Sequence, residues 1–390
     1  MPTILAALFA AFLTTGMSSS VSHVLTMVGG CVASLIMAGY AMVHPGSRVH
    51  PTFLLCGVGM AILALLSAEA NRCVESSTIH VICCYLALLS MGFSGPSLSG
   101  FCRKLLLFNN VFLTAWVIYF GFQGDAFEAW KISNPSGAGN LMAAQINMTI
   151  PLVIGFIVSA SFQGKILWSM LLSANILAVF LVMSRNGIGS LLALLILYLL
   201  FNHKRLAVCV LIPTILLAIF PHLITQNPII RPILVHLRVM DFKPVAPRSL
   251  IWDLSAQHIA EHPVFGVGPG KTRVALSILD INHAHNNVIQ VALETGIPSA
   301  LLYLCVVAAM LSLPARAAFR DQRTFLPTLG ILAYMSYSLT AGPLVFPSAT
   351  FMLAACVNEA RYPAAQRISQ VRPSSRVSIL PPPRLAGARI

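Results

Sequence analysis

Residues 52–70 read TFLLCGVGMAILALLSAEA, and the one charged side chain in this run, Glu69, stands beside its end. An α-helix of about this length crosses the ~30 Å hydrocarbon core of a bilayer. Because lipid offers no hydrogen-bond partner, the backbone polar groups must pair within the segment, as they do in a helix. The run therefore predicts a transmembrane helix, since the strands of a membrane barrel would instead show short segments of alternating polarity.

Similar apolar runs recur along the chain. Of its 390 residues 57% are hydrophobic and 9% are charged, whereas a soluble domain usually has about 25% charged residues. The sequence thus predicts an all-α membrane protein with about twelve transmembrane helices. The expected spans are residues 3–17, 22–43, 52–70, 78–101, 105–122, 140–162, 166–183, 187–202, 206–224, 288–312, 324–342 and 345–359.

These spans divide the chain into four parts. Residues 1–224 hold helices 1 to 9, residues 225–287 form a long outer loop, and residues 288–359 hold helices 10 to 12. Residues 360–390 form a basic tail rich in Arg and Pro, which we expect to be disordered and to lie against anionic headgroups.

Basic residues indicate which side of the membrane each connection faces. When the connections are assigned to alternating sides, most Lys and Arg fall on one side, which the positive-inside rule identifies as the cytoplasm. Both termini are then cytoplasmic, and the net charge of +13 reflects topology and anionic lipid rather than nucleic acid. The residues on that side are Arg48, Arg103, Lys104, Lys165, Lys204, Arg205, Arg316, Arg320, Arg323 and the tail from Arg361 to Arg389.

The outer loop carries bases that topology does not require. They are either a solvated surface or a site for an anion, and Arg248 opens a segment to Glu261 that we expect to be an amphipathic helix ended by His262-Pro263. A second unusual base is Arg185, which lies in Ser-Arg-Asn between two spans that almost touch. It either snorkels to the interface or serves a function, as bases near the hydrocarbon often do. Arg185 and Arg248 could converge on a phosphate, which the planar guanidinium fork suits.

The loop returns to the membrane through Asn282-His-Ala-His285-Asn286-Asn287. Here a histidine can serve as a general base near neutral pH, as a structural residue, or as half of a metal site. The metal reading is the weakest, because Asp280 is the nearest further ligand and a zinc site needs three or four. The Gly266-x-Gly-x-Gly270 stretch lacks the preceding strand and following Lys-Ser/Thr of a nucleotide loop, so it predicts an irregular turn.

Taken together, these segments resemble the O-antigen ligase and O-antigen polymerase superfamily of bacterial envelopes. The similarity is carried by Ser184-Arg185 before an apolar helix and by Arg248-x-x-x-Trp252 in the loop. It continues in Pro263-x-x-Gly266-x-Gly268 and His285-Asn286-x-x-x-Gln290-x-x-x-Glu294-x-Gly296, with weaker support from Asn140 and Asn147. The matching part runs from about Met183 to Tyr303, and Asn186 departs from the small residues usual beside the arginine.

The resemblance implies a large periplasmic loop capped by short helices, in the inner membrane of a Gram-negative bacterium. It implies transfer of a glycan from an undecaprenyl-pyrophosphate carrier to a sugar hydroxyl, with inversion and without metal or cofactor. In a ligase the acceptor is the lipid A-core; in a polymerase it is another carrier-linked glycan, and a further relative glycosylates protein serines. A transporter or flippase is the alternative from another class.

The roles that follow are expectations. Arg185 and Arg248 would stabilise the leaving pyrophosphate, and His285 would take the proton of the attacking hydroxyl. Among the supporting residues, Asn286 would orient the ring of His285 and Trp252 would stack on a sugar. Glu294 would accept from a sugar hydroxyl, hydrogen-bond His285, or cap the helix.

Overall fold

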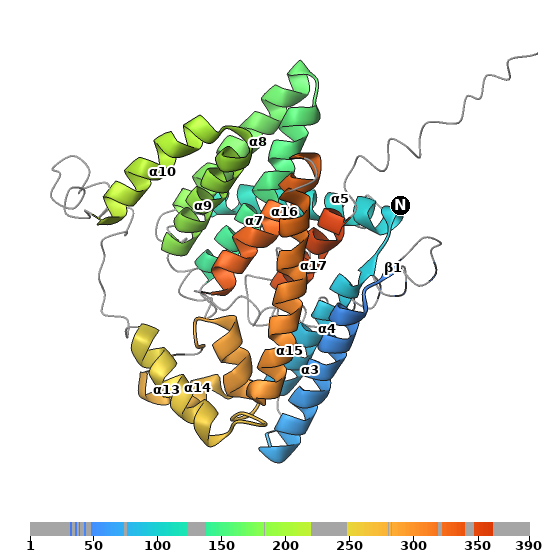
Figure 1. The fold of residues 1–390 in the computed structure, drawn as a ribbon, viewed down its shortest axis with the longest axis vertical. Helices are drawn as coiled ribbons and strands as arrows, with labels where there is room; N and C mark the ends of the chain where they lie inside the picture. The colour runs from blue at the N-terminus through green and yellow to red at the C-terminus, as the bar shows by residue number, and fades with distance from the viewer. Residues whose placement is uncertain are drawn as a thin grey trace, which may run out of the picture.

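A computed structural model describes residues 48–73, 76–122, 138–182, 184–219, 248–279, 281, 283–318, 322–339 and 347–361, with isolated positions at 32, 36, 39 and 43. Some predicted segments lie wholly or almost wholly outside these residues, namely the spans 3–17 and 22–43, the loop residues 225–247 and the tail. The elements are β1 (Arg48–Val49), α3 (Pro51–Ala70), α4 (Ser76–Leu89), η1 (Ser90–Gly92), β2 (Phe93–Ser94), α5 (Pro96–Gly121), α7 (Ala138–Ser159), α8 (Phe162–Leu181), α9 (Arg185–Asn202), α10 (Lys204–Ile219), α13 (Arg248–Glu261), α14 (Thr272–Ala275), η2 (Ser277–Leu279), α15 (Asn287–Ala318), α16 (Gln322–Ser338) and α17 (Pro347–Arg361) (Figure 1).

The described part of the chain is almost entirely helical, as the apolar runs predicted. Every expected span from 52–70 onward overlaps a described helix, but span 78–101 is divided among α4, η1, β2 and the start of α5. Among the residues that the structure describes, five helical segments are long and apolar enough to cross a membrane: Pro51–Ala70, Leu98–Gly121, Asn140–Ser159, Phe162–Leu181 and Asn287–Leu313. The total of twelve spans and their orientation stay predictions.

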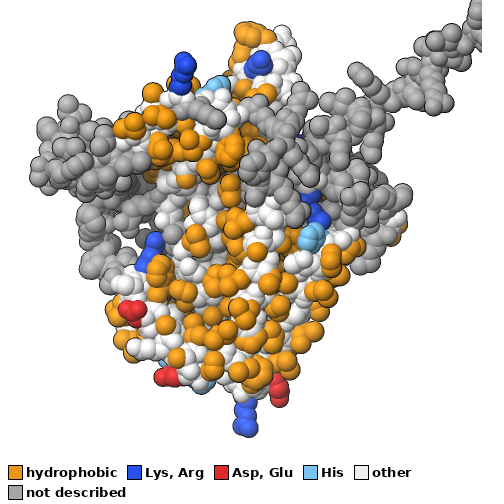
Figure 2. Space-filling model, in the orientation of Figure 1, with side chains coloured by type: hydrophobic (Ala, Val, Ile, Leu, Met, Phe, Trp, Pro, Cys, Tyr) orange, Lys and Arg blue, Asp and Glu red, His pale blue; other side chains and the backbone are white. Residues whose placement is uncertain are grey.

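The core forms where these helices pack on one another. In Figure 1, α15 runs through the middle of the molecule beside α3, and the two helices share a buried cluster with α4, α5 and α17. A second cluster joins α7 to α8, α9 and α16. Figure 2 shows apolar side chains covering the centre of one face, with charged side chains mainly around its edge.

The break before α5 differs from the predicted one. We expected a connection at 101–105 that exposes Arg103, but the chain breaks at Phe93–Gly95, where β2 pairs with β1 and Pro96 then starts α5. Arg103 therefore lies inside α5, where its Nε donates to Glu359 Oε1 on α17 at 2.7 Å. The buried Glu359 also accepts from Ser99, so a part-buried ion pair replaces the expected exposed base.

The grouping of bases at one end of the bundle survives this correction. Arg48 is in β1, which pairs with β2, and Arg361 donates to the carbonyl of Met91, 3.1 Å away and close to β2. Arg103 lies two turns into α5, just beyond β2. We call this the basic end, and the opposite end, where α13, α14 and the start of α15 lie (Figure 1), the loop end.

Candidate functional site

The turn that carries His285 is fixed on both sides of Ala284. The backbone N–H of Ala284 donates to Gln290 Oε1 at 2.7 Å, and its carbonyl accepts from Trp252 Nε1 at 3.0 Å. These bonds tie the turn to α15 and α13, respectively. His285 itself adopts a left-handed backbone conformation with φ 55°, which is uncommon outside glycine and gathers at functional sites.

His285 is held neutral by its surroundings. Burial lowers its pKa from the ordinary value of 6.5, and the positive charge of Arg248 lowers it further. Its ring lies against that of His283, with centroids 4.2 Å apart. Burial and His285 bring the pKa of His283 down to about 4. The first residue of α13 thus acts electrostatically on an imidazole that is uncharged at pH 7 and can accept a proton on its free ring nitrogen.

Asn286 sets the start of α15. Its Oδ1 accepts from the backbone N–H groups of Val288 and Ile289 at 2.9 and 3.2 Å, which is the geometry of a helix N-cap. Its Nδ2 approaches the carbonyl of Leu339, just after α16, at 3.4 Å. We predicted that Asn286 contacts the ring of His285, whereas these contacts are with α15 and Leu339. They fix the backbone of Asn286, which directly follows His285.

Glu294 and Trp252 also make contacts other than those predicted. Glu294 is 6% exposed, and its Oε1 accepts from Thr272 at 2.7 Å and from Gln290 Nε2 at 2.6 Å. Trp252 packs half-buried on the cluster of Ile251, Leu276 and Leu293. Both side chains hold the loop to α15. From the sequence, Thr272 was not predicted to belong to the site, and Gln290 was identified only as a residue of the motif, without a role, although the i,i+4 spacing of Gln290 and Glu294 was visible.

A glycine clasp closes the loop onto α15. Gly296 has φ 86° and ψ 170°, so α15 kinks there, and Ile297 N–H donates to the Pro263 carbonyl at 2.8 Å. Gly266, with φ 63°, passes so close that an added Cβ would lie 2.4 Å from the carbonyl oxygen of Leu293. The predicted irregular turn is confirmed, and its close backbone contacts with α15 explain why glycine is needed.

Ser184 anchors the start of α9. Its Oγ caps the helix by accepting from Gly187 N at 3.0 Å, and it donates to Asn140 Oδ1 at 2.6 Å. Asn147 Nδ2 donates to the carbonyl of Gly187 at 2.8 Å, so both asparagines of α7 hold this turn. Arg185 is the first residue of α9; its side chain lies outside the described residues.

The end of α16 links the two motifs. Ser184 Oγ lies 2.9 Å from the hydroxyl of Tyr337, and Asn286 contacts Leu339 two residues later. The start of α9 and the His285 turn are therefore both at the loop end. The structure brings Arg248 to His285 and brings the backbone of Arg185 to the same end of the bundle.

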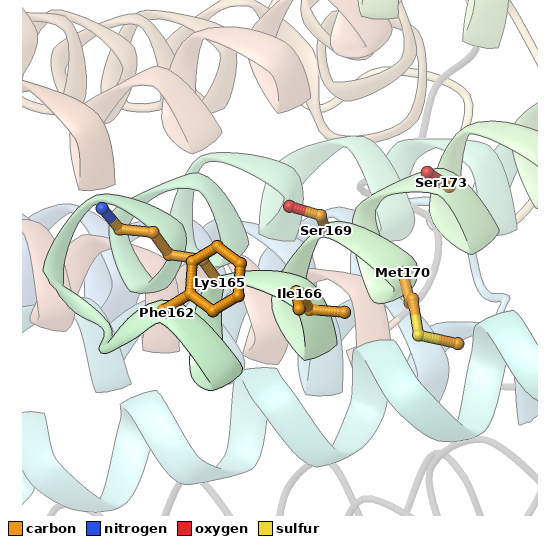
Figure 3. Close-up of a pocket in the computed structure, with 6 residues that line it drawn as sticks. All are labelled: Phe162, Lys165, Ile166, Ser169, Met170 and Ser173. Carbon is orange, nitrogen blue, oxygen red and sulfur yellow. The ribbon is translucent and has the colours of Figure 1, made fainter.

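A hollow on α8 lies apart from this cluster. It is shallow, has a volume of about 610 Å³ and runs along the first half of α8 (Figure 3), at the end of that helix remote from Ser184. It is lined by Phe162, Lys165, Ile166, Ser169, Met170 and Ser173. Across the described residues, no three His, Cys, Asp or Glu side chains gather as a metal site would require.

Comparison with known proteins bears on the same segment. Residues 168–304 match the family described as O-antigen ligase. This confirms the resemblance seen between Met183 and Tyr303, and the matched stretch contains Arg185, Arg248 and His285. A protein of Rickettsia conorii whose name describes it as a polysaccharide ligase is 33% identical over 75 residues. That match covers 16% of this chain and 18% of the relative, so the chain aligns with under a fifth of the relative's length.

Proposed function

We propose that this protein is an O-antigen ligase, a glycosyltransferase that moves a glycan from undecaprenyl pyrophosphate to a sugar hydroxyl of the lipid A-core. The observation that carries the proposal is the position of Arg248 near a partly buried His285, close enough to lower its pKa, inside the segment that matches the O-antigen ligase family. The word ligase in the relative's name favours a ligase over a polymerase.

The reaction needs charge stabilisation and a base. As the bond between the anomeric carbon and the pyrophosphate breaks, its electron pair stays with the pyrophosphate oxygen. Arg248 and Arg185 stabilise this growing negative charge, which accelerates the reaction because the charge is larger in the transition state. The acceptor oxygen attacks the opposite face of the anomeric carbon, which inverts it, and passes its proton to His285. No metal or cofactor takes part.

The environment of His285 suits this sequence of events. An imidazolium beside the Arg248 guanidinium is unfavourable on its own, as the lowered pKa of His285 indicates. The departing pyrophosphate carries negative charge to the same place, so protonation of His285 and departure of the leaving group favour each other. Gln290 and Trp252 keep the ring in place by holding Ala284.

The membrane arrangement follows from this chemistry. The loop end faces the periplasm, where the carrier presents its glycan, and the basic end faces the cytoplasm of a Gram-negative cell with both termini. Arg361 at the basic end lies where anionic lipid headgroups would be. Because donor and acceptor are both held by the membrane, the enzyme gains proximity and alignment without a nucleotide.

The test is complementation of a deletion strain. Arg185→Ala, Arg248→Ala and His285→Ala should each leave polymer on the carrier and bare lipid A-core, while the protein still inserts. Arg248→Lys should retain part of the activity because it keeps the charge but loses the fork. The exposed Arg273 and His262 offer matched controls, and their alanine variants should behave like wild type.

Two outcomes would redirect the proposal. Core bearing a single repeat after deletion would identify a polymerase. Wild-type surface glycan in any one of the three alanine variants would remove that residue from the mechanism.

Transfer between purified carrier-linked glycan and acceptor in detergent, with no compartments, separates an enzyme from a transporter.

A further inference from the structure

The segment between α13 and the glycine clasp exposes two apolar side chains. Val264 is 53% exposed and Phe265 is 37% exposed. Single exposed apolar residues are ordinary on a protein surface and need no explanation. This pair differs because its backbone is fixed at a definite height on the membrane-spanning helices.

Three hydrogen bonds hold the pair in place. The carbonyl of Pro263 accepts from Ile297 N at 2.8 Å, at the kink of α15. The carbonyl of Phe265 accepts from Ser67 Oγ on α3. The carbonyl of Gly266 accepts from Asn71 Nδ2 at 3.2 Å. Val264 and Phe265, which we call the tip, are therefore held between α3 and α15, and their side chains are not free to fold back into the loop.

The position of the tip along the membrane normal follows from the length of α3. The helix has 20 residues, which at a rise of about 1.5 Å per residue gives a length of roughly 30 Å, close to the thickness of the hydrocarbon core. Ser67 stands three residues before the last residue of α3, Ala70. The Phe265 carbonyl thus lies about one helical turn inside the end of a span that just crosses the membrane.

The exposed surface along both spans beside the tip is apolar, whereas Glu69 and Arg72 at the end of α3 and Glu261 and His262 just before the tip are exposed charged or polar residues. On α15, Ile297 follows the kink and is 42% exposed, and Leu301 is exposed one turn further. On α3, Leu65 and Leu66 are exposed beside Ser67. In a helix that spans a bilayer such residues face acyl chains, so Val264 and Phe265 extend a lipid-facing surface.

We infer that Val264 and Phe265 form a membrane-inserted tip, which anchors the outer loop in the acyl chains of the adjacent leaflet. The tip follows α13 directly, so it holds the helix that carries Arg248 at a fixed height beside the bilayer surface. This inference concerns lipid contact alone and stands whether or not the chain transfers glycans.

Tryptophan fluorescence tests it on the full-length protein in lipid nanodiscs. The four native tryptophans are changed to Phe, and Phe265→Trp or Val264→Trp is added. Lipids brominated near the headgroup end of the acyl chain should quench either tryptophan at least twofold more than lipids brominated near the chain terminus. Aqueous acrylamide should quench both only weakly.

Two control variants in the same background calibrate the scale. Leu301→Trp reports a deeper lipid contact, and Gln257→Trp on the exposed side of α13 reports water. Acrylamide quenching at position 265 equal to that at 257, with no effect of brominated lipid, would overturn the inference. Agreement between the variants at 264 and 265 guards against a local disturbance by either one.

Discussion

Replacing Gly296 with alanine should detach the outer loop from α15. Gly296 has φ 86° and ψ 170°, a region that residues with a Cβ avoid, and it forms the kink that lets the first turns of α15 belong to the loop. The His285 turn and the glycine clasp lie on either side of these turns. A change at Gly296 therefore acts on the site without touching any residue of the proposed mechanism.

The size of the effect has two parts. The backbone conformation alone should destabilise the alanine variant by about 1–3 kcal/mol. In addition, the new Cβ would lie 2.0 Å from the Val264 carbonyl oxygen, whereas ordinary contacts begin near 3.4 Å. The loop must then move by about 1.4 Å, the difference between these two distances. A misplacement of roughly 1 Å can reduce the rate of an enzyme about 10²-fold.

The assay combines glycan transfer in reconstituted vesicles with apparent thermal stability in detergent. Gly296→Ala should lower both the rate and the melting temperature. Gly100→Ala is the matched control, because Gly100 lies within α5 and an added Cβ there meets nothing within 4 Å. If Gly296→Ala retained wild-type rate and stability, the kink would not hold the loop and the reasoning would be wrong.

Three further predictions concern the His285 turn. Gln290→Met should lower transfer at least tenfold, because it leaves the buried N–H of Ala284 without an acceptor; unchanged turnover in vesicles would show that Ala284 needs no clamp. Arg248→Gln should raise the pKa of His285 by removing a repelling charge, which the pH dependence of diethylpyrocarbonate modification at His285 measures by mass spectrometry. His283 has a folded pKa of about 4 against 6.5 unfolded, so the stability it contributes is present above pH 6.5 and is lost as the pH falls to about 4. The loss is at most ~3 kcal/mol; thermal unfolding across this range should show it, and His283→Asn should reduce it, leaving the part that comes from the lowered pKa of His285.

Most of the fold could be predicted from composition, because a helix is the only open structure that satisfies its own backbone in lipid. The error at Arg103 shows the limit of that argument. A base in an apolar segment predicts a connection, but Arg103 is neutralised by Glu359, 256 residues away in the sequence. No local window contains that partner, so only Gly95-Pro96 signalled the true break.

The site was predicted in part, and the division has a physical cause. The order of the motifs led to Arg248 and His285, and the charge of Arg248 lowers the pKa of His285 in the structure, whereas their catalytic roles stay predictions. The contacts of Trp252 and Glu294 could not be predicted in full, because they involve the Ala284 carbonyl and Thr272, which the fold brings from other parts of the loop. The cap formed by Asn286 is local, and its place just before α15 could have indicated it. Spacing says which residues occur together, whereas their hydrogen bonds depend on where the chain bends.

The polar residues of the loop end also follow a logic that a search for substrate contacts overlooks. A carboxylate or amide buried beside a membrane must find partners within the protein, or burial becomes unfavourable. The side chains of Glu294, Gln290 and Thr272 hydrogen-bond to one another. Gln290 Oε1 accepts a further hydrogen bond from the backbone N–H of Ala284. The network that makes burial tolerable is thus the same network that positions His285. Part of this motif therefore has a structural role, which is to hold the His285 turn on α15.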